Sequence, residues 1–170
     1  MPTDVFATEL TALLPRLRRL AHALARPPAD PDDLAQASVE RMLRARDQWQ
    51  PGTRFDAWAF RVMRNLWIDT TRANARANAR RAPEEEGLNV GDDPRAGLEA
   101  RSELAAVRQA LAQLPDEQRE VVVLITIEGL GYAEVAALLD LPIGTVSSRL
   151  LRGRTALLQL LGGKETDDGC

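Results

Sequence analysis

The chain has 170 residues, of which 45% are apolar and only 4% aromatic, so it has room for one ordinary domain or two small ones. No apolar run approaches the roughly 20 residues of a membrane span, and no secretory hydrophobic run opens the chain, so we expect no membrane insertion. The single cysteine, Cys170, has no partner within the chain, and no cluster of Cys and His suits zinc. We therefore expect a cytoplasmic protein without metal or cofactor.

The net charge of −3 conceals an uneven distribution along the chain. Residues 1–81 hold 14 arginines and 9 acidic residues, a balance of +5, whereas residues 82–100 carry −5 and residues 101–170 carry −3. A basic part of this kind is what the phosphate backbone of a nucleic acid would meet. Moderately basic helical domains are also common, so charge alone does not identify a nucleic-acid-binding protein.

Three helices are expected before the first acidic stretch. Helical spacing of the apolar residues predicts a first helix over 4–25, and the prolines that follow it end it. Asp30 or Asp32 can cap a second helix. A Pro-Gly turn comes next, and a third helix starts near Phe55 and runs to at least Arg72, or through the Ala/Arg/Asn tract behind it.

Residues 82–97 are rich in acidic residues, glycine and proline, a composition that cannot bury a core and predicts a flexible acidic linker. Beyond it, apolar periodicity and turn signals predict helices at 98–113, 116–128, 132–139 and 143–161. Residues 162–170 are expected to be a disordered tail. The predicted fold class is therefore all-α, with two small helical domains, 1–81 and 98–161, joined by the linker.

The last two predicted helices have the pattern of a helix-turn-helix, with residues 140–142 (DLP) as a three-residue turn. The expected buried face of the first of these helices comprises Tyr132, Val135, Ala136 and Leu139. The expected core side of the second comprises Val146, Leu150, Gly153 and Leu157. The opposite side of the second helix carries Thr145, Ser148, Arg149 and Arg152, with Ser147 and Leu151 at its margin.

That outward side suits the major groove of DNA. Arginine can hydrogen-bond guanine edges or phosphates, serine and threonine serve either, and an exposed Leu151 could contact a thymine methyl group. No acidic residue occurs between residues 141 and 163 to repel the phosphates. The alternative is an ordinary helical hairpin with a solvated arginine face, because helix-turn-helix patterns match many unrelated sequences.

The third helix carries a second candidate surface. Helical spacing places Phe60, Arg64, Trp67 and Thr71 on one side. Aromatic residues interleaved with arginine suit packing against the second helix, which we favour for Trp58 and Phe60. They also suit a surface on which the bases of a single strand stack, at about 1–3 kcal/mol per base.

Residues 114–120 (LPDEQRE), 128–136 (EGLGYAEVA) and 142–149 (PIGTVSSR) resemble region 4 of the extracytoplasmic-function (ECF) sigma factors, bacterial proteins that direct RNA polymerase to promoters. In that family, region 4 reads the −35 promoter element. Taken with the outward side of the helix, the resemblance assigns −35 contacts to Thr145, Ser147, Ser148, Arg149, Leu151 and Arg152. Ser147 stands where the family often has a basic residue.

Residues 32–36 (DDLAQ), 55–58 (FDAW) and 61–69 (RVMRNLWID) resemble region 2 of the same family, in the same order relative to region 4. The resemblance covers nearly the whole chain, from about Leu10 to Leu161. In the family, region 2 captures flipped-out bases of the −10 element. Its pocket asparagine corresponds to Asn65, whose amide can both donate and accept hydrogen bonds. Around it, Arg61, Arg64 and Arg72 are expected to contact the DNA backbone of the −10 element, and Trp67 lies on the candidate stacking side.

The resemblance also implies partners. In the family, the second helix of region 2 binds the clamp helices of the polymerase β′ subunit, the β flap is a further contact, and an anti-sigma factor commonly controls the protein. The residues that match the clamp contact here are Asp33, Leu34, Gln36 and Arg41. Ala37 stands where many members have an acidic residue. Residues 49–53 (WQPGT) are similar to a signature of the general-stress-response subgroup.

The expected function is therefore that of a sigma factor, which binds core RNA polymerase and promoter DNA. An enzyme is not expected, because His22 is the only histidine and no catalytic triad, metal cluster or phosphate-binding glycine loop occurs. One alternative is a stand-alone helix-turn-helix regulator, which would bind duplex DNA as a dimer without polymerase. The other is a sigma-like decoy that sequesters an anti-sigma factor, and such a decoy has no need of Asn65, Arg149 or Arg152.

Overall fold

The structure is a computed structural model that describes residues 4–26, 29–80 and 98–162. Throughout these ranges every regular element is helical, so the expected all-α class is confirmed. In chain order the elements are α1 (Val5–Leu24), α2 (Pro31–Arg44), the 3₁₀ turn η1 (Arg46–Gln48), α3 (Phe55–Arg80), α4 (Leu98–Gln113), α5 (Asp116–Val122), the π-helical turn η2 (Val123–Ile127), α6 (Tyr132–Leu139) and α7 (Ile143–Gly162). The expected linker at 82–97 lies outside the described residues. The expected tail does too, except for Gly162, which ends α7.

Local sequence signals explain where the first two helices begin. Asp4 caps α1, because its carboxylate accepts a hydrogen bond from the backbone N–H of Phe6 at 3.1 Å. Asp30, one of the two residues expected to cap α2, accepts from the N–H of Asp32 at 2.8 Å. Pro31 then occupies the first helical position, where no N–H is needed. Each of these signals is local, so the sequence predicted both helix starts to within a residue or two.

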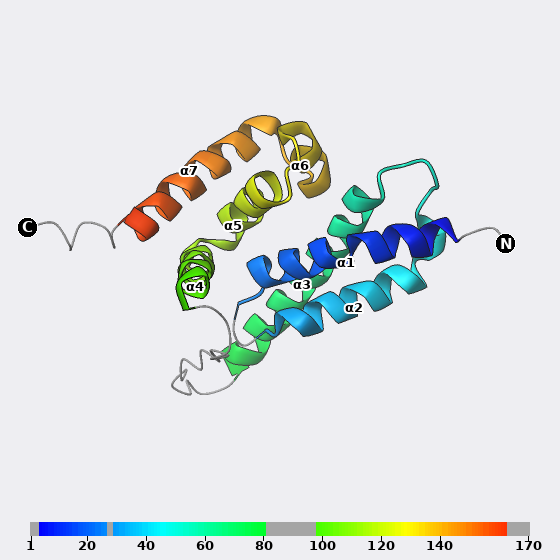
Figure 1. The fold of residues 1–170 in the computed structure, drawn as a ribbon, viewed down its shortest axis with the longest axis horizontal. Helices are drawn as coiled ribbons and strands as arrows, with labels where there is room; N and C mark the ends of the chain where they lie inside the picture. Colours follow the sequence, from blue (N-terminus) through cyan, green and yellow to red (C-terminus); the bar gives the residue numbers. More distant parts are fainter. Residues whose placement is uncertain (1–3, 27–28, 81–97, 163–170) are drawn as a thin grey trace, which may run out of the picture.

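Helices α1, α2 and α3 pack around a common core (Figure 1). Its fully buried members include Leu17 and Leu20 of α1, Met42 of α2, and Phe60 and Met63 of α3. The interpretation of Phe60 as a packing residue is therefore confirmed.

A cluster of aromatic rings fixes the outer end of this three-helix group. The Trp58 ring is half-buried and lies 5.8 Å from the Phe6 ring and 5.6 Å from the Phe55 ring. Trp49, which follows η1, meets Phe55 edge-on at 5.2 Å between ring centroids. Edge-on contacts of this kind are favourable for aromatic rings, so Trp58 acts in packing, as we favoured. The rings it meets belong to α1 and α3, however, and not to the second helix.

In the C-terminal half, α5 and α7 pack closely against each other. Gly153 of α7 lies so near α5 that a β-carbon at this position would come within 2.6 Å of Cγ2 of Val122. The expected single helix over 116–128 is divided, because its last turn widens into the π-helical η2. Leu157, expected on the core side of α7, is half-buried.

Helices α6 and α7 form the predicted helix-turn-helix, in which Asp140 ends α6 in the left-handed conformation at φ 55°. One residue of the predicted buried face was wrong, since Tyr132 is 43% exposed. Helical side chains lean toward the helix N-terminus, so the side chain of the first residue extends past the end of α6 into solvent. The buried face of α6 comprises Val135, Ala136, Leu138 and Leu139.

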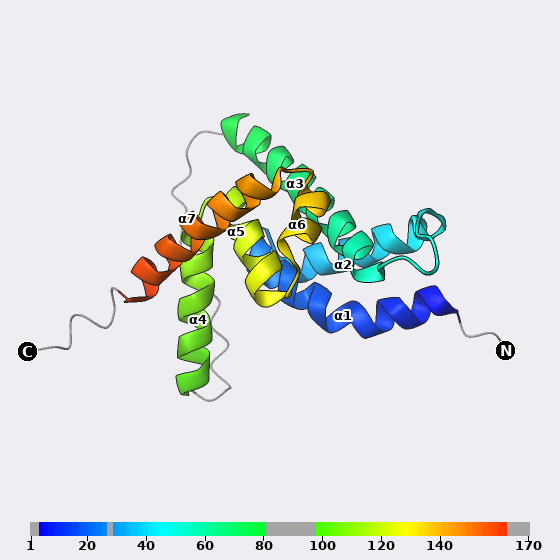
Figure 2. The ribbon, with the colours of Figure 1, turned by 90° about the horizontal axis from the view of Figure 1, so that it is seen from above.

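The two halves of the chain lie against each other in this structure (Figures 1 and 2). Helix α1 contacts α4, α5 and η2, and α3 contacts α6. The buried apolar residues form a cluster with members in both halves, while Asn65 remains exposed at the surface of α3. Within the described ranges, no helix combines the length and apolarity needed to cross a membrane.

Candidate nucleic-acid interface

The outward side of α7 presents most of the residues predicted to read the −35 element. Leu151 is 68% exposed, and Ser148 and Arg152 are also exposed. Thr145 and Ser147 are half-buried at the edges of this side. The face is therefore rich in hydrogen-bond donors around one exposed aliphatic side chain, which are the groups that direct readout in the major groove requires.

Arg149 has a partner inside the C-terminal half. Its Nη2 lies 3.4 Å from a carboxylate oxygen of Glu117 on α5, and only 23% of the Arg149 side chain is exposed, against 71% for Glu117. Because Glu117 is mostly exposed to solvent, the pair is weak, typically worth at most about 1 kcal/mol. Glu117 can therefore hold Arg149 in place without preventing it from turning to a phosphate or a guanine.

The α3 surface predicted to bind the −10 element is divided between exposed and covered residues. Asn65 and Arg72 are exposed. Arg61 is exposed too, and it donates from Nη2 to the carbonyl oxygen of Ala137 in α6 at 3.3 Å. Arg64 donates from Nε to the Glu120 carboxylate of α5 at 3.1 Å.

Trp67 is the most deeply covered residue of the predicted −10 surface, with 5% of its area exposed. The guanidinium carbon of Arg119 on α5 lies 5.7 Å from the centre of its ring, within the range of a cation–π contact. A base cannot stack on Trp67 in this arrangement, because its ring is already covered. Stacking there requires the two halves to separate.

Two charged residues of α5 are buried beneath this contact. Desolvation raises the pKa of Glu120, against the hydrogen bond and charge of Arg64 and the charge of Arg149, which lower it. Desolvation likewise lowers the pKa of Arg119, against the pairing with Asp116 that raises it. The Nε and Nη1 atoms of Arg119 are buried without a hydrogen-bond partner. Burial therefore works against both charges in this arrangement.

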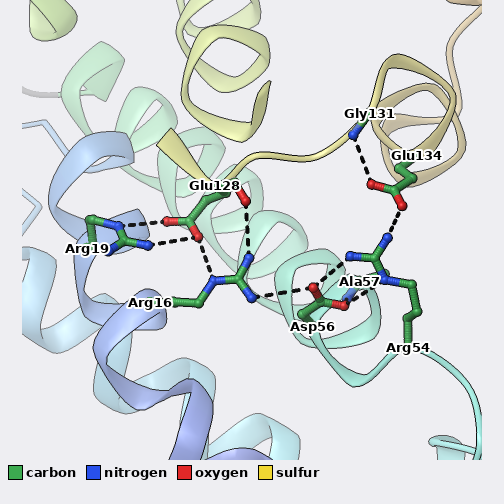
Figure 3. Close-up of polar contacts among 8 residues, drawn as sticks. All are labelled: Arg16, Arg19, Arg54, Asp56, Ala57, Glu128, Gly131 and Glu134. Atoms are coloured by element: carbon green, nitrogen blue, oxygen red, sulfur yellow. Dashed lines mark hydrogen bonds and ion pairs between the residues drawn. The ribbon is translucent and has the colours of Figure 1, made fainter. Parts of the chain in front are cut away.

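A second ionic cluster joins α1 to the turn before α6 (Figure 3). The Glu128 carboxylate, whose side chain has 0% exposure, accepts hydrogen bonds from Nε of Arg16 at 3.0 Å and from Nε of Arg19 at 3.2 Å. Arg16 also donates from Nη2 to the Glu128 carbonyl oxygen at 3.2 Å. From the other side, Arg16 lies 3.4 Å from the Asp56 carboxylate.

Asp56 and Glu134 extend this cluster through Arg54 (Figure 3). Burial opposes the ionisation of Asp56. The hydrogen bonds from Arg54 and from the Ala57 N–H, with the charges of Arg54 and Arg16, outweigh burial and lower the Asp56 pKa below its usual range. Arg54 also pairs with Glu134, which in turn accepts from the Gly131 N–H at 2.9 Å.

Sequence reasoning assigned no role to Glu120, Glu128, Arg16 or Arg19. One signal could have pointed to the two glutamates, since they flank the apolar run of residues 121–127. A carboxylate beside such a run is either at a surface or buried with cationic partners. The identity of those partners depends on how the two halves pack.

The residues predicted to contact the polymerase lie along α2. Asp33, Gln36 and Arg41 are exposed, whereas Leu34 is 7% exposed and belongs to the core of the N-terminal half. Gln36 also lines a groove of about 510 Å³ between α1 and α2. Three of the four side chains are therefore available to a partner.

Comparison with known proteins identifies both halves of the chain. A family model described as sigma-70 region 2 matches residues 10–77, and one described as sigma-70 region 4 matches residues 104–157. The chain is 33% identical over 162 residues to the ECF RNA polymerase sigma factor EcfG of Rhodopseudomonas palustris, covering 94% of this chain and 86% of that protein. The chain belongs to the ECF sigma factors of the sigma-70 family.

Other relatives agree with this assignment. The ECF sigma factor SigE of Mycolicibacterium smegmatis is 38% identical over 148 residues, covering 86% of this chain, which spans 57% of that relative's length. The sigma factor RpoE of Bartonella quintana, solved in complex with the anti-sigma factor NepR, superimposes with a TM-score of 0.79 at 29% identity, covering 92% of this chain and 96% of that one. CnrH, solved with the cytosolic domain of CnrY, gives a TM-score of 0.67 at 31% identity, covering 93% of this chain and 88% of that one. The family is not one of catalytic enzymes.

Proposed function

We propose that this ECF sigma factor binds core RNA polymerase in the cytoplasm and directs it to specific promoters, under the control of an anti-sigma factor. The observation that carries the proposal is the presence of both regions in one chain, in the order of its relatives. The sigma factor RpoE, solved with its anti-sigma factor, shares this fold over nearly its full length, which supports an anti-sigma factor as a partner here. Assignment to the general-stress-response subgroup stays a prediction.

Each region has its own proposed role. Region 2 captures the −10 element through Asn65, with Arg61, Arg64, Trp67 and Arg72 around it. Region 4 reads the −35 element through the outward side of α7, and above all through Arg149 and Arg152. The exposure of Asn65, Arg72 and Arg152 supports these assignments. The exposed residues Asp33, Gln36 and Arg41 would contact the polymerase clamp.

Reconstituted transcription tests the proposal. Purified protein with core polymerase is expected to start transcripts at specific sites of a genomic promoter library, whereas neither component alone does so. A stand-alone regulator would instead bind duplex DNA tightly without polymerase. A decoy would bind an anti-sigma factor and start no transcript. Failure to start any transcript across the library refutes the proposal.

Two substitutions separate the roles of the regions. Asn65→Ala is expected to impair promoter opening, with the matched variant Asn78→Ala, at an exposed asparagine further along α3, as its control. Arg149→Ala is expected to weaken binding of the −35 element, by about 1–3 kcal/mol if it contacts a base bidentately. Its control is Arg154→Ala, at an exposed arginine of the same helix. Unchanged opening and unchanged −35 affinity would show that these residues are wrongly assigned.

A further inference from the structure

The contact between the two halves contains a set of ion pairs. The pairs that join them are Arg16–Glu128, Arg19–Glu128, Arg26–Asp116, Arg54–Glu134 and Arg64–Glu120. In every one of these pairs the arginine comes from the N-terminal half and the carboxylate from the C-terminal half. At this contact, carboxylates of the C-terminal half thus neutralise arginines of the basic N-terminal half.

Glu128 is the centre of this contact, and we refer to Glu128 with Arg16 and Arg19 as the latch. The Glu128 side chain has 0% exposure, and the side chains of Arg16 and Arg19 are 32% and 51% exposed. A buried carboxylate is stable only with charged or hydrogen-bonding partners, and the side-chain partners of Glu128 both come from α1. The latch therefore exists only while the halves are together.

We call the arrangement of this structure, in which the two halves lie against each other, the closed arrangement. It covers part of the surface proposed to bind the −10 element. Arg64 forms an ion pair with Glu120, and Arg61 donates a hydrogen bond to the carbonyl of Ala137. Arg119 covers the ring of Trp67. Carboxylate and carbonyl oxygens of α5 and α6 thus occupy arginine donors that a phosphate backbone would use. Region 4 and single-stranded DNA cannot hold Arg64 and Trp67 at the same time.

The same contact includes a feature that favours opening. Arg119 is 1% exposed, and its Nε and Nη1 have no hydrogen-bond partner. An unpaired buried donor is destabilising, and separation of the halves would return these groups to water. The latch thus stabilises the closed arrangement, and the burial of Arg119 destabilises it. Opposing contributions of this kind allow both the closed and the open arrangement to be populated.

We propose that region 4 of this protein is an internal competitor for the −10 surface of region 2, held closed by the latch of Glu128 with Arg16 and Arg19. The masking part of this inference rests on the proposed function, whereas the latch does not. Opening exposes Arg64 and Trp67 and releases Arg61, which is already exposed, from the Ala137 carbonyl. The apparent affinity of the free protein for DNA is the intrinsic affinity multiplied by the fraction of molecules that are open.

Fluorescence energy transfer in the full chain tests the latch. Dyes are attached to cysteines placed at Thr11 of α1 and Gln159 of α7, both exposed, with Cys170→Ser removing the natural thiol. The ratio of open to closed molecules is measured across a NaCl titration, so that both states are populated.

The variant Arg19→Gln removes one arm of the latch at a half-exposed residue, where a substitution is expected to leave the fold intact. Its matched control is Arg18→Gln, at the neighbouring residue of α1, because the Arg18 pair with Asp32 lies wholly within the N-terminal half. Arg19→Gln is expected to raise the open-to-closed ratio about threefold and Arg18→Gln to leave it unchanged. Glu128→Gln, which removes the buried charge, is expected to raise the ratio about tenfold or more.

The outcomes separate the latch from the proposed function. If Arg19→Gln and Glu128→Gln have the same open-to-closed ratio as the control Arg18→Gln, the latch is overturned. This holds whether or not the protein acts with polymerase. If these two variants open the chain and also tighten binding of single-stranded DNA carrying a mapped −10 element by the factor by which the open fraction rises, the whole inference stands. Opening without tighter binding overturns the masking of the −10 surface. Transcription by the wild type at saturating polymerase tests the proposed function independently.

Discussion

Replacement of Gly153 by alanine probes the closest approach of two helices in region 4. The added β-carbon would lie 2.6 Å from Cγ2 of Val122 and 3.4 Å from both Cβ and the carbonyl oxygen of Gln118. Carbon atoms prefer a separation of about 3.5–4.0 Å, so Val122 must move by about 1 Å. Val122 is 2% exposed and tightly enclosed, and it cannot move without disturbing its neighbours.

Two opposing effects set the size of the change in the free energy of unfolding. Overpacking of a core is destabilising by about 1–3 kcal/mol, and a contact this short belongs in the upper half of that range. Alanine is a better helix former than glycine by about 0.5–1 kcal/mol, which offsets part of the loss. The expected net destabilisation of Gly153→Ala is therefore about 1–2.5 kcal/mol.

Urea unfolding of the full chain, followed by far-ultraviolet circular dichroism, measures this change. Gly144→Ala on the same helix is the matched control, because nothing lies within 4 Å of the position its β-carbon would take. It is expected to raise the free energy of unfolding by up to about 1 kcal/mol. In a Val122→Ala background, from which the clashing methyl group is absent, Gly153→Ala is expected to lose its destabilising effect.

The reasoning fails if Gly153→Ala is as stable as the wild type. It fails equally if Gly153→Ala destabilises the chain by the same amount whether residue 122 is valine or alanine. In either case the distance from Gly153 to Val122 would not control the packing of α7 on α5.

Two further substitutions test other parts of the structure. Asp30→Ala removes the hydrogen bond to the Asp32 N–H and is expected to lower the free energy of unfolding by about 1 kcal/mol, with Asp30→Asn close to wild type in the same urea assay. Because burial raises the Glu120 pKa in the folded state, the folded protein binds a proton more tightly than the unfolded chain, and stability falls as pH rises from about 4.5. In Glu120→Gln the free energy of unfolding is expected to fall less steeply as pH rises above about 4.5. Equal slopes in the wild type and the variant would show that Glu120 is not the cause.

The sequence by itself determined most of the helices and several of their ends. Asp30 and Pro31 start α2, and the turn at residues 140–142 separates α6 from α7, because each signal acts on its own backbone neighbours. The outward side of α7 also followed from helical spacing alone. The division of residues 116–128 into α5 and η2 did not, since no feature of the sequence marks a widened turn.

The tertiary structure alone decided which side chains of the proposed DNA-binding surface are covered. Arg16 and Glu128 are 112 residues apart in the chain, and Arg64 and Glu120 are 56 apart. Helical periodicity assigns a residue to a face of its own helix, but it carries no information about what packs on that face. Whether Trp67 meets solvent, a base or Arg119 is set by the balance between the ion pairs of the closed contact and the hydration that these charges regain when it opens.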